Sequence, residues 1–152
     1  MKRAMTIILC LLITAASCFG ASAYDVSPTS ETQITQTVTE ADSNITIIEE
    51  LIVQENARSS TRSATRRQTF MKGDNTIAVI ALSATFSYDG SSVSVVSKSV
   101  SQCDTYNGWS FSRNSLTSVG GTATLTGQLT KLLNRPVNVN ISITCDKNGN
   151  VS

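Results

Sequence analysis

The stretch from Val137 to Cys145 reads Val-Asn-Val-Asn-Ile-Ser-Ile-Thr-Cys, and it decides the fold class of this chain. An apolar residue occupies every second position, and the residues between them are asparagine, serine or threonine. Strict alternation of this kind is typical of a β-strand with one buried face and one face in water. Because the last inward position is Cys145, a thiol is expected at the end of the most clearly patterned strand.

Four further strand candidates precede this stretch, and turn signals separate them. The candidates cover residues 76–88, 93–103, 109–119 and 122–133. Asp89-Gly90, Gly120-Gly121 and Asn148-Gly149 are typical hairpin turns, and Val95-Val96 interrupts the alternation as a β-bulge would. The pattern therefore predicts a mainly β domain, a small antiparallel sandwich or barrel of about five to six strands.

The first residues have the layout of a secretory leader. Lys2 and Arg3 precede an apolar run over residues 4–19, and Ala21-Ser22-Ala23 follows with small residues at the positions that signal peptidase reads. We expect a signal peptide over residues 1–23, with Ala21 and Ala23 at the cleavage site, Tyr24 as the first mature residue and a secreted product without stable membrane insertion. The alternative is lipoprotein processing, with an anchor at Cys18.

Cleavage of the leader leaves two cysteines, Cys103 and Cys145. An even number of cysteines in an exported chain predicts a disulfide, here between these two residues, that would staple the small β domain. We expect Trp109, close to Cys103 in the sequence, to pack against this bridge. Two free buried thiols are the alternative.

Charge divides the mature chain into segments. Residues 25–55 carry seven acids and no base, whereas residues from 58 onward carry ten bases and four acids. Ile45, Ile48 and Ile52 recur at spacings of three and four, which predicts a helix over about residues 45–56. We therefore divide the chain into a signal peptide (1–23), an acidic, partly helical arm (24–57), a linker rich in Arg, Ser and Thr (58–68) and a disulfide-stapled β domain (69–152).

The linker is the predicted site of proteolytic processing. Arg58, Arg62 and Arg66 repeat every four residues, and Arg67 follows directly. An exposed segment of this composition is readily cut by trypsin-like proteases. Continuation of the arm helix is the alternative, and four arginines in a secreted chain do not indicate a nucleic-acid partner.

The residue inventory argues against catalysis. The chain has no histidine, and it lacks a phosphate-binding glycine loop and the serine-nucleophile motifs. The four carboxylates of the β domain lie mostly in turn contexts, where aspartate bonds to nearby backbone. They are Asp74, Asp89, Asp104 and Asp146. Asp146, Asn148 and Asn150 begin like a calcium loop but lack its glycine and glutamate spacing. We therefore expect no enzyme activity, no cofactor and no metal.

An aromatic cluster offers the best candidate for ligand contact. Tyr106, Trp109 and Phe111 lie within six positions, with Asn107 and Asp104 beside them. Such rings bind sugars when a loop displays them, and they are core residues when they alternate on one strand face. The candidate contacts are Tyr106, Asn107 and Trp109.

The order of these features also resembles a known group of proteins. After the leader and the acidic arm come Arg58-Ser59-Ser60-Thr61-Arg62, Thr85-Phe86-Ser87-Tyr88-Asp89-Gly90-Ser91, Cys103, Trp109 and the terminal Thr144-Cys145-Asp146-Lys147-Asn148-Gly149-Asn150-Val151-Ser152. The layout is similar to that of a loose group of small, mostly uncharacterised secreted β-domain proteins of Gram-positive anaerobes. This resemblance implies secretion and a β fold, and it implies no catalytic residue.

Two functions fit these observations. The first is a secreted, non-catalytic binding or structural module that recognises a cell-surface polymer or a protein through a sheet face or a loop. The second is the proprotein of a small toxin- or bacteriocin-like factor, whose acidic arm is cleaved off at the Arg-rich linker.

Overall fold

The computed structural model describes residues 35–41, 44–55 and 60–152. The predicted signal peptide, its cleavage site, the alternative anchor at Cys18 and the predicted processing residue Arg58 all lie outside the described residues.

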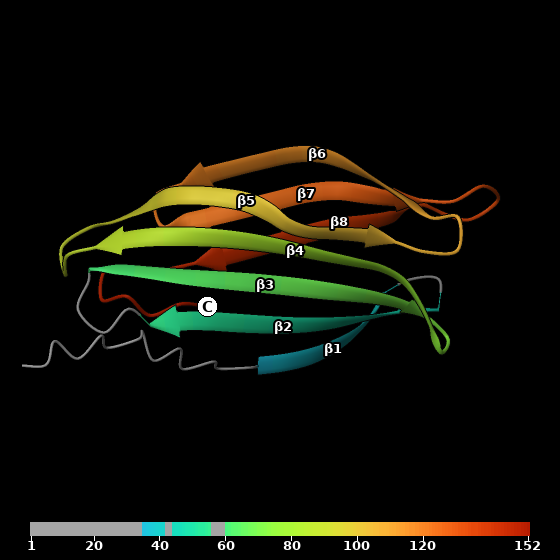
Figure 1. The fold of residues 1–152 in the computed structure, drawn as a ribbon, viewed down its shortest axis with the longest axis horizontal. Helices are drawn as coiled ribbons and strands as arrows, with labels where there is room; N and C mark the ends of the chain where they lie inside the picture. The colour runs from blue at the N-terminus through green and yellow to red at the C-terminus, as the bar shows by residue number, and fades with distance from the viewer. Residues whose placement is uncertain (1–34, 42–43, 56–59) are drawn as a thin grey trace, which may run out of the picture.

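The described chain forms eight strands in two antiparallel sheets (Figure 1). The strands are β1 (Thr35–Ala41), β2 (Ile45–Glu55), β3 (Thr61–Lys72), β4 (Asn75–Tyr88), β5 (Val93–Thr105), β6 (Ser110–Val119), β7 (Thr122–Thr130) and β8 (Val137–Thr144). The first sheet has the order β1-β2-β3-β4-β5 and the second the order β6-β7-β8. Each strand therefore pairs with its neighbour along the chain, except between β5 and β6, where the chain passes from one sheet to the other.

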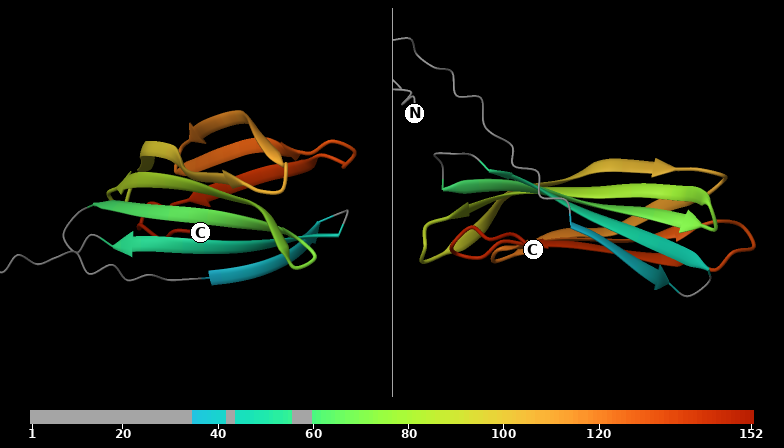
Figure 2. Two further views of the ribbon diagram at one scale, coloured as in Figure 1. Left: turned by 45° about the vertical axis from the view of Figure 1, so that its right-hand side comes forward. Right: turned by 90° about the horizontal axis from the view of Figure 1, so that it is seen from below.

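The two sheets lie face to face around one apolar core (Figure 2). Strand β8 confirms the alternation that the sequence predicts, because Val137, Val139, Ile141 and Ile143 are buried while Asn138 and Asn140 are exposed. The largest fully buried side chains come from both sheets: Phe70, Phe86, Ile80, Leu82, Leu125, Leu129, Ile141, Ile143, Val139 and Cys145. The predicted antiparallel β fold is thus confirmed, with two separate sheets as in a sandwich.

The outer faces of both sheets carry pairs of hydroxyl side chains. In the first sheet the Thr65 and Ser83 hydroxyl oxygens are 2.6 Å apart, and in the second those of Ser115 and Thr126 are 2.8 Å apart. Cross-strand pairs of this kind stabilise antiparallel sheets. Their hydroxyl groups are therefore already engaged with one another.

The predicted strands of the second half are confirmed, and so is the bulge. Phe86 pairs with Val95 and Thr85 pairs with Ser97, so Val96 is left over between them. A residue without a partner in the opposite strand is the definition of a β-bulge.

The predicted helix over residues 45–56 is wrong, because residues 45–55 form strand β2. Six of its eleven residues are β-branched, which favours a pleated strand over a helix. Ile45 and Val53 are buried, and Ile47 and Leu51 pack against the same core. The spacing of the isoleucines is compatible with a helix, but alternate residues of the same segment also form the apolar face of a strand.

The predicted linker is also wrong where the structure describes it, because β3 begins at Thr61 and lies between β2 and β4. The acidic and basic segments are two paired strands of one sheet: Glu50 lies opposite Arg67, and Glu55 lies opposite Arg62. The Nε atom of Arg67 donates to a Glu50 carboxylate oxygen at 2.7 Å. Where the structure describes them, the acidic and basic segments therefore belong to one sheet, and the ion pair between Arg67 and Glu50 joins them.

The predicted disulfide is not formed, and both Cys103 and Cys145 are free thiols. Cys103 pairs with Ile80 on β4, whereas Cys145 follows β8, beside the turn that contains Gly121. That turn lies at the Phe86 end of β4, and the six residues from Phe86 to Ile80 span about 20 Å of strand. A disulfide requires Cα atoms within about 7 Å, so this fold cannot bridge the pair.

Candidate functional site

The two ends of the sandwich differ in construction. We call one the pocket end: it comprises the β3–β4 turn (residues 73–74), the β5–β6 loop (106–109) and the β7–β8 loop (131–136). We call the other the hairpin end: it comprises the β4–β5 turn (89–92), the β6–β7 turn (120–121) and the C-terminal hairpin (146–150). Antiparallel connections of successive strands bring each group of loops together (Figure 1).

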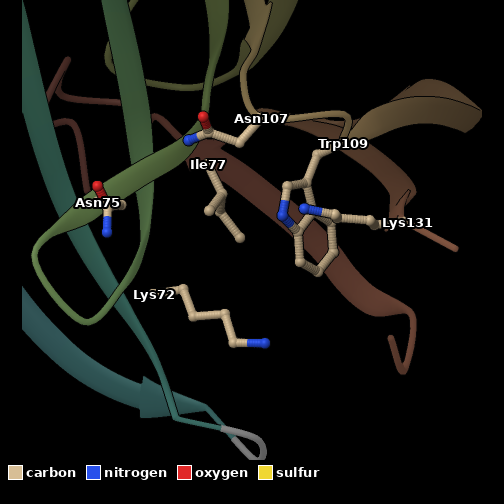
Figure 3. Close-up of a pocket in the computed structure, with 6 residues that line it drawn as sticks. All are labelled: Lys72, Asn75, Ile77, Asn107, Trp109 and Lys131. Carbon is tan, nitrogen blue, oxygen red and sulfur yellow. The ribbon is translucent and has the colours of Figure 1, made fainter. Parts of the chain in front are cut away.

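A cavity of about 270 Å³ lies at the pocket end (Figure 3). Its lining combines three segments that are distant in the sequence: the adjoining ends of β3 and β4, the β5–β6 loop, and the start of the β7–β8 loop. The lining residues are Lys72, Asn75, Ile77, Asn107, Trp109 and Lys131.

The floor of the cavity is apolar and fixed. Ile77 is 2% exposed and Trp109 is 5% exposed, and both belong to the core. The Trp109 backbone N–H donates to the Tyr106 carbonyl at 3.0 Å, and the Tyr106 N–H donates to the Ile77 carbonyl at 2.9 Å. Asn107 takes a left-handed backbone conformation with φ of 55°, which asparagine tolerates better than most residues. These contacts hold the β5–β6 loop against β4.

The wall of the cavity is cationic and rich in amides. Lys72 and Lys131 supply two ammonium groups, Asn75 and Asn107 supply two side-chain amides, and no carboxylate is among the lining residues. The Lys72 Nζ atom donates to the Asn134 side-chain oxygen at 2.9 Å, which holds this lysine near the β7–β8 loop. Lysine ammonium groups and amide N–H groups are all hydrogen-bond donors, so the cavity fits an anionic or oxygen-rich ligand.

Lys131 reaches the cavity from the opposite side. Its Cε atom lies 4.0 Å from the position that a Cβ atom on Gly108 would occupy, so the side chain passes close to the β5–β6 loop. Figure 3 shows its ammonium group directed toward Trp109, while the Lys72 ammonium lies below them. Two cations therefore border one small opening, one from strand β3 and one from the β7–β8 loop.

Two of the three predicted ligand contacts, Asn107 and Trp109, line this cavity. The third, Tyr106, is 45% exposed beside it. Trp109 satisfies both interpretations that the sequence left open, because it is a core residue whose remaining surface faces the cavity. Sequence reasoning missed Lys72 and Lys131, since only the fold brings the end of β3 to the start of the β7–β8 loop.

The other predicted site residues lie elsewhere. Arg62, Arg66 and Arg67 are in β3, where Arg62 donates to the Gly149 carbonyl and Arg67 pairs with Glu50. Asp104 accepts a hydrogen bond from the Gln102 amide at 2.7 Å and does not line the cavity.

The hairpin end is saturated with internal hydrogen bonds, as the turn contexts of Asp89 and Asp146 predict. One Asp89 oxygen accepts from the backbone of Ser91 and Ser92, at 2.8 and 2.7 Å. These bonds, above all the one from Ser92, lower the pKa of Asp89. Asp146 has a lowered pKa for a similar reason.

Both carboxylate oxygens of Asp146 are engaged in the C-terminal hairpin. The Asn150 side-chain amide donates to one oxygen at 2.7 Å, and the backbone N–H groups of Asn148 and Asn150 donate to the other at 2.8 Å each. The Asn150 bonds are the main reason why the pKa of Asp146 is lowered. A carboxylate with both oxygens engaged in its own turn has little capacity left for a ligand.

Neither thiol is activated as a nucleophile. Burial raises the pKa of both Cys103 and Cys145, and the neighbouring Asp104 and Asp146 raise them further. The thiolate is the nucleophile, so a raised pKa makes these cysteines less reactive at neutral pH. Within the described parts of the chain, no three His, Cys, Asp or Glu side chains are grouped closely enough to hold a metal ion.

No helix among the described residues has the length and apolarity that a bilayer span requires. Comparison of the chain with family models, with curated proteins and with solved structures gives no match.

Proposed function

We propose that this protein is a secreted, non-catalytic binding module that captures an acidic sugar unit of a surface polymer in the cavity at its pocket end. The observation that supports this proposal is the convergence of two lysines and two asparagines on an apolar floor, in a cavity without a lining carboxylate. A carboxylate or sulfate group of the ligand would face Lys72 and Lys131.

The polar lining groups match the hydroxyl groups of a sugar. Asn75 and Asn107 offer amide donors and acceptors to these hydroxyl groups, while Ile77 and Trp109, which are almost fully buried, close the floor beneath them. Drug-sized ligands occupy cavities of about 300–1,000 Å³, so a cavity of about 270 Å³ suits one sugar unit. A longer polymer would extend from it into solvent.

Other surfaces and the second candidate function have less support. Several hydroxyl groups of the outer faces form pairs with one another, as Ser63 does with Thr85. Release of an N-terminal segment at Arg62, Arg66 or Arg67 would require cleavage within β3, which has a paired strand on both sides. No observation therefore favours the proprotein over the binding module.

The test measures binding of the full secreted chain to a polysaccharide that contains uronic acid, with a neutral polysaccharide as the reference. The double variant Lys72→Ala/Lys131→Ala removes both ammonium groups of the cavity. Since a hydrogen bond to a charged group contributes about 1.5–3 kcal/mol, we expect the affinity to fall at least about tenfold.

The matched control is Lys98→Ala/Lys147→Ala, which removes the same charge outside the cavity lining. Its affinity should stay within about twofold of the parent, since only long-range charge is lost and salt screens it. Equal losses in the two double variants would mean non-specific attraction, and the proposal would be wrong.

A further inference from the structure

Two adjacent leucines at the pocket end are almost fully exposed. Leu132 is 86% exposed and Leu133 is 98% exposed, and neither lines the cavity. Both lie in the β7–β8 loop, which projects beyond the ends of the strands in Figure 1 and in both views of Figure 2. Single exposed apolar residues are common on protein surfaces, but a projecting pair is unusual.

The loop holds these leucines outward by its own hydrogen bonds. The Asn134 backbone N–H donates to the Lys131 carbonyl at 3.0 Å, and the Asn134 side-chain amide donates to the Leu132 carbonyl at 3.1 Å. Leu133 takes a left-handed backbone conformation with φ of 64°, which is strained for a residue with a branched side chain. The tip is therefore built at some cost in strain to keep two apolar side chains in solvent.

Basic residues flank the tip, and the described acids at this end, Asp74 and Asp104, lie in the β3–β4 turn and at the end of strand β5. Lys131 and Arg135 flank the two leucines, and the Lys72 ammonium reaches Asn134 within the same loop. Between Asp104 and Asp146 the sequence has no acidic residue, so every charged side chain of the second sheet and of the loops between its strands is basic. Asp74, in the neighbouring β3–β4 turn, is the acid nearest in sequence to Lys72.

We infer that the β7–β8 loop docks reversibly onto an anionic lipid bilayer, with Leu132 and Leu133 in the acyl boundary and Lys72, Lys131 and Arg135 at the headgroup phosphates. Membrane-surface elements combine inserted apolar side chains with basic residues that contact anionic lipids. The leucine tip is convex, so it can be buried either in a deformable bilayer or in a protein hollow of matching shape. The basic residues on both sides of the tip favour the bilayer, because an anionic bilayer is negatively charged over its whole surface. The inference goes beyond sugar binding, since the leucines lie outside the cavity.

The first experiment measures co-flotation of the full secreted chain with vesicles. One set contains two parts phosphatidylcholine to one part phosphatidylglycerol, and the other contains phosphatidylcholine alone. We expect binding to the anionic vesicles that weakens with added salt, and much weaker binding to the neutral ones. Absence of binding to the anionic vesicles, or equal binding to both sets, would overturn the inference.

The second experiment removes the apolar tip without disturbing its backbone. Leu132→Ser/Leu133→Asn should lower the vesicle partition coefficient about a hundredfold, since each inserted leucine contributes about tenfold. Asparagine tolerates the left-handed conformation at position 133, and neither leucine is part of the core, so folding is preserved. The matched control is Val119→Ser, which removes an 82% exposed apolar residue at the hairpin end and should leave partition unchanged.

Two further outcomes separate the alternatives. If the leucine variant loses self-association in solution but keeps vesicle binding, the tip is a protein contact and the inference is wrong. If it keeps its affinity for the acidic polysaccharide and loses vesicle binding, the inference stands independently of the proposed function. Lys131→Ala/Arg135→Ala should lower partition onto the anionic vesicles by about fivefold for each charge removed.

Discussion

The two ends of this sandwich use similar polar residues in opposite ways. At the hairpin end, Asp89 and Asp146 direct their carboxylates back into their own turns, and the Gly90 N–H joins two of these turns by donating to the Lys147 carbonyl at 2.9 Å. At the pocket end, two lysines and two asparagines face an open cavity, and two leucines face solvent. Groups that satisfy one another stabilise a fold, whereas groups that border a cavity keep donors for a ligand: the Lys72 ammonium, which donates to Asn134, has two further N–H groups.

The same contrast holds for close packing. At the hairpin end, a Cβ atom on Gly149 would lie 2.5 Å from the Tyr88 ring. At the pocket end, a Cβ atom on Gly73 would have no neighbour within 4 Å. Both glycines have positive φ, 86° and 59°, so they differ in packing rather than in backbone conformation.

The largest expected effect on stability comes from alanine substitutions at Gly149 and Gly73. Gly149→Ala should lower the free energy of unfolding by about 2–4 kcal/mol, because a left-handed alanine is strained and its methyl group collides with Tyr88. Gly73→Ala should cost only about 1 kcal/mol, since it introduces the strain without the collision. Urea denaturation of the two variants measures both values, and equal losses would contradict the idea that only the hairpin end is tightly packed.

The two cysteines are expected to differ in their contribution to stability and in their accessibility, with smaller effects than the two glycines. Cys145 is buried beside the hairpin end and Cys103 is exposed, so Cys145→Ala should cost about 1–2 kcal/mol and Cys103→Ala less than about 0.5 kcal/mol. In the folded protein, a thiol reagent should modify Cys103 long before Cys145. Two reactive thiols are expected after denaturation without reductant. A count of zero would show instead that the two cysteines form the disulfide that the sequence predicts.

Acid should weaken the hairpin end more than the pocket end. Folding lowers the pKa of Asp89 and Asp146, so their contribution to stability is present above the pKa of the unfolded chain and is lost as pH falls through the folded pKa. The melting temperature should therefore decrease when the pH is lowered below about 4, which is close to the ordinary aspartate pKa. Because both carboxylates are exposed, the change should be modest.

The control for this effect is Asp146→Asn, which keeps an oxygen acceptor but does not titrate. Its melting temperature should depend less steeply on pH between about pH 4 and pH 2 than that of the parent. An unchanged slope would show that the acid sensitivity arises elsewhere in the molecule.

How much the sequence predicts depends on whether a pattern is local. Alternation in residues 137–145 and the turn signals at Asp89-Gly90 and Asn148-Gly149 predict the second half well, because strands and tight turns are determined by neighbouring residues. The apolar residues of 45–55 fit both the period of a helix and the period of a strand, and pairing with β3 makes the segment a strand. Glu50 and Arg67 are 17 positions apart in the sequence, and only the β2–β3 register shows that they pair.

The candidate site divides in the same way. Asn107 and Trp109 are predictable because they are close in sequence and carry ligand-type side chains. Lys72 and Lys131 are 59 positions apart, and no sequence rule places an ammonium group from β3 opposite one from the β7–β8 loop. The exposure of Leu133 is equally hard to predict, since in the sequence it continues the alternate apolar positions Ala123, Leu125 and Leu129 of strand β7.

The last expected effect has the opposite sign and concerns the left-handed residues of the two ends. At the hairpin end these residues are glycines, whereas the β7–β8 loop places Leu133 in this conformation. Leu133→Gly should raise the free energy of unfolding by about 0.5–1 kcal/mol, because relief of strain exceeds the added entropy of glycine in the unfolded chain.

The matched control is Leu132→Gly, at a neighbouring position that does not share the positive φ. It should be neutral or slightly destabilising, since it adds chain entropy without relieving strain. The two variants differ by one position and remove the same side chain. The difference between their free energies of unfolding, measured by denaturation, therefore gives the contribution of backbone strain at position 133. A more stable Leu133→Gly variant that also loses vesicle binding would indicate that the leucine is retained for its contact with lipid. Loss of stability in this variant would mean that Leu133 makes a structural contribution, and the contrast between the two ends would then be weaker.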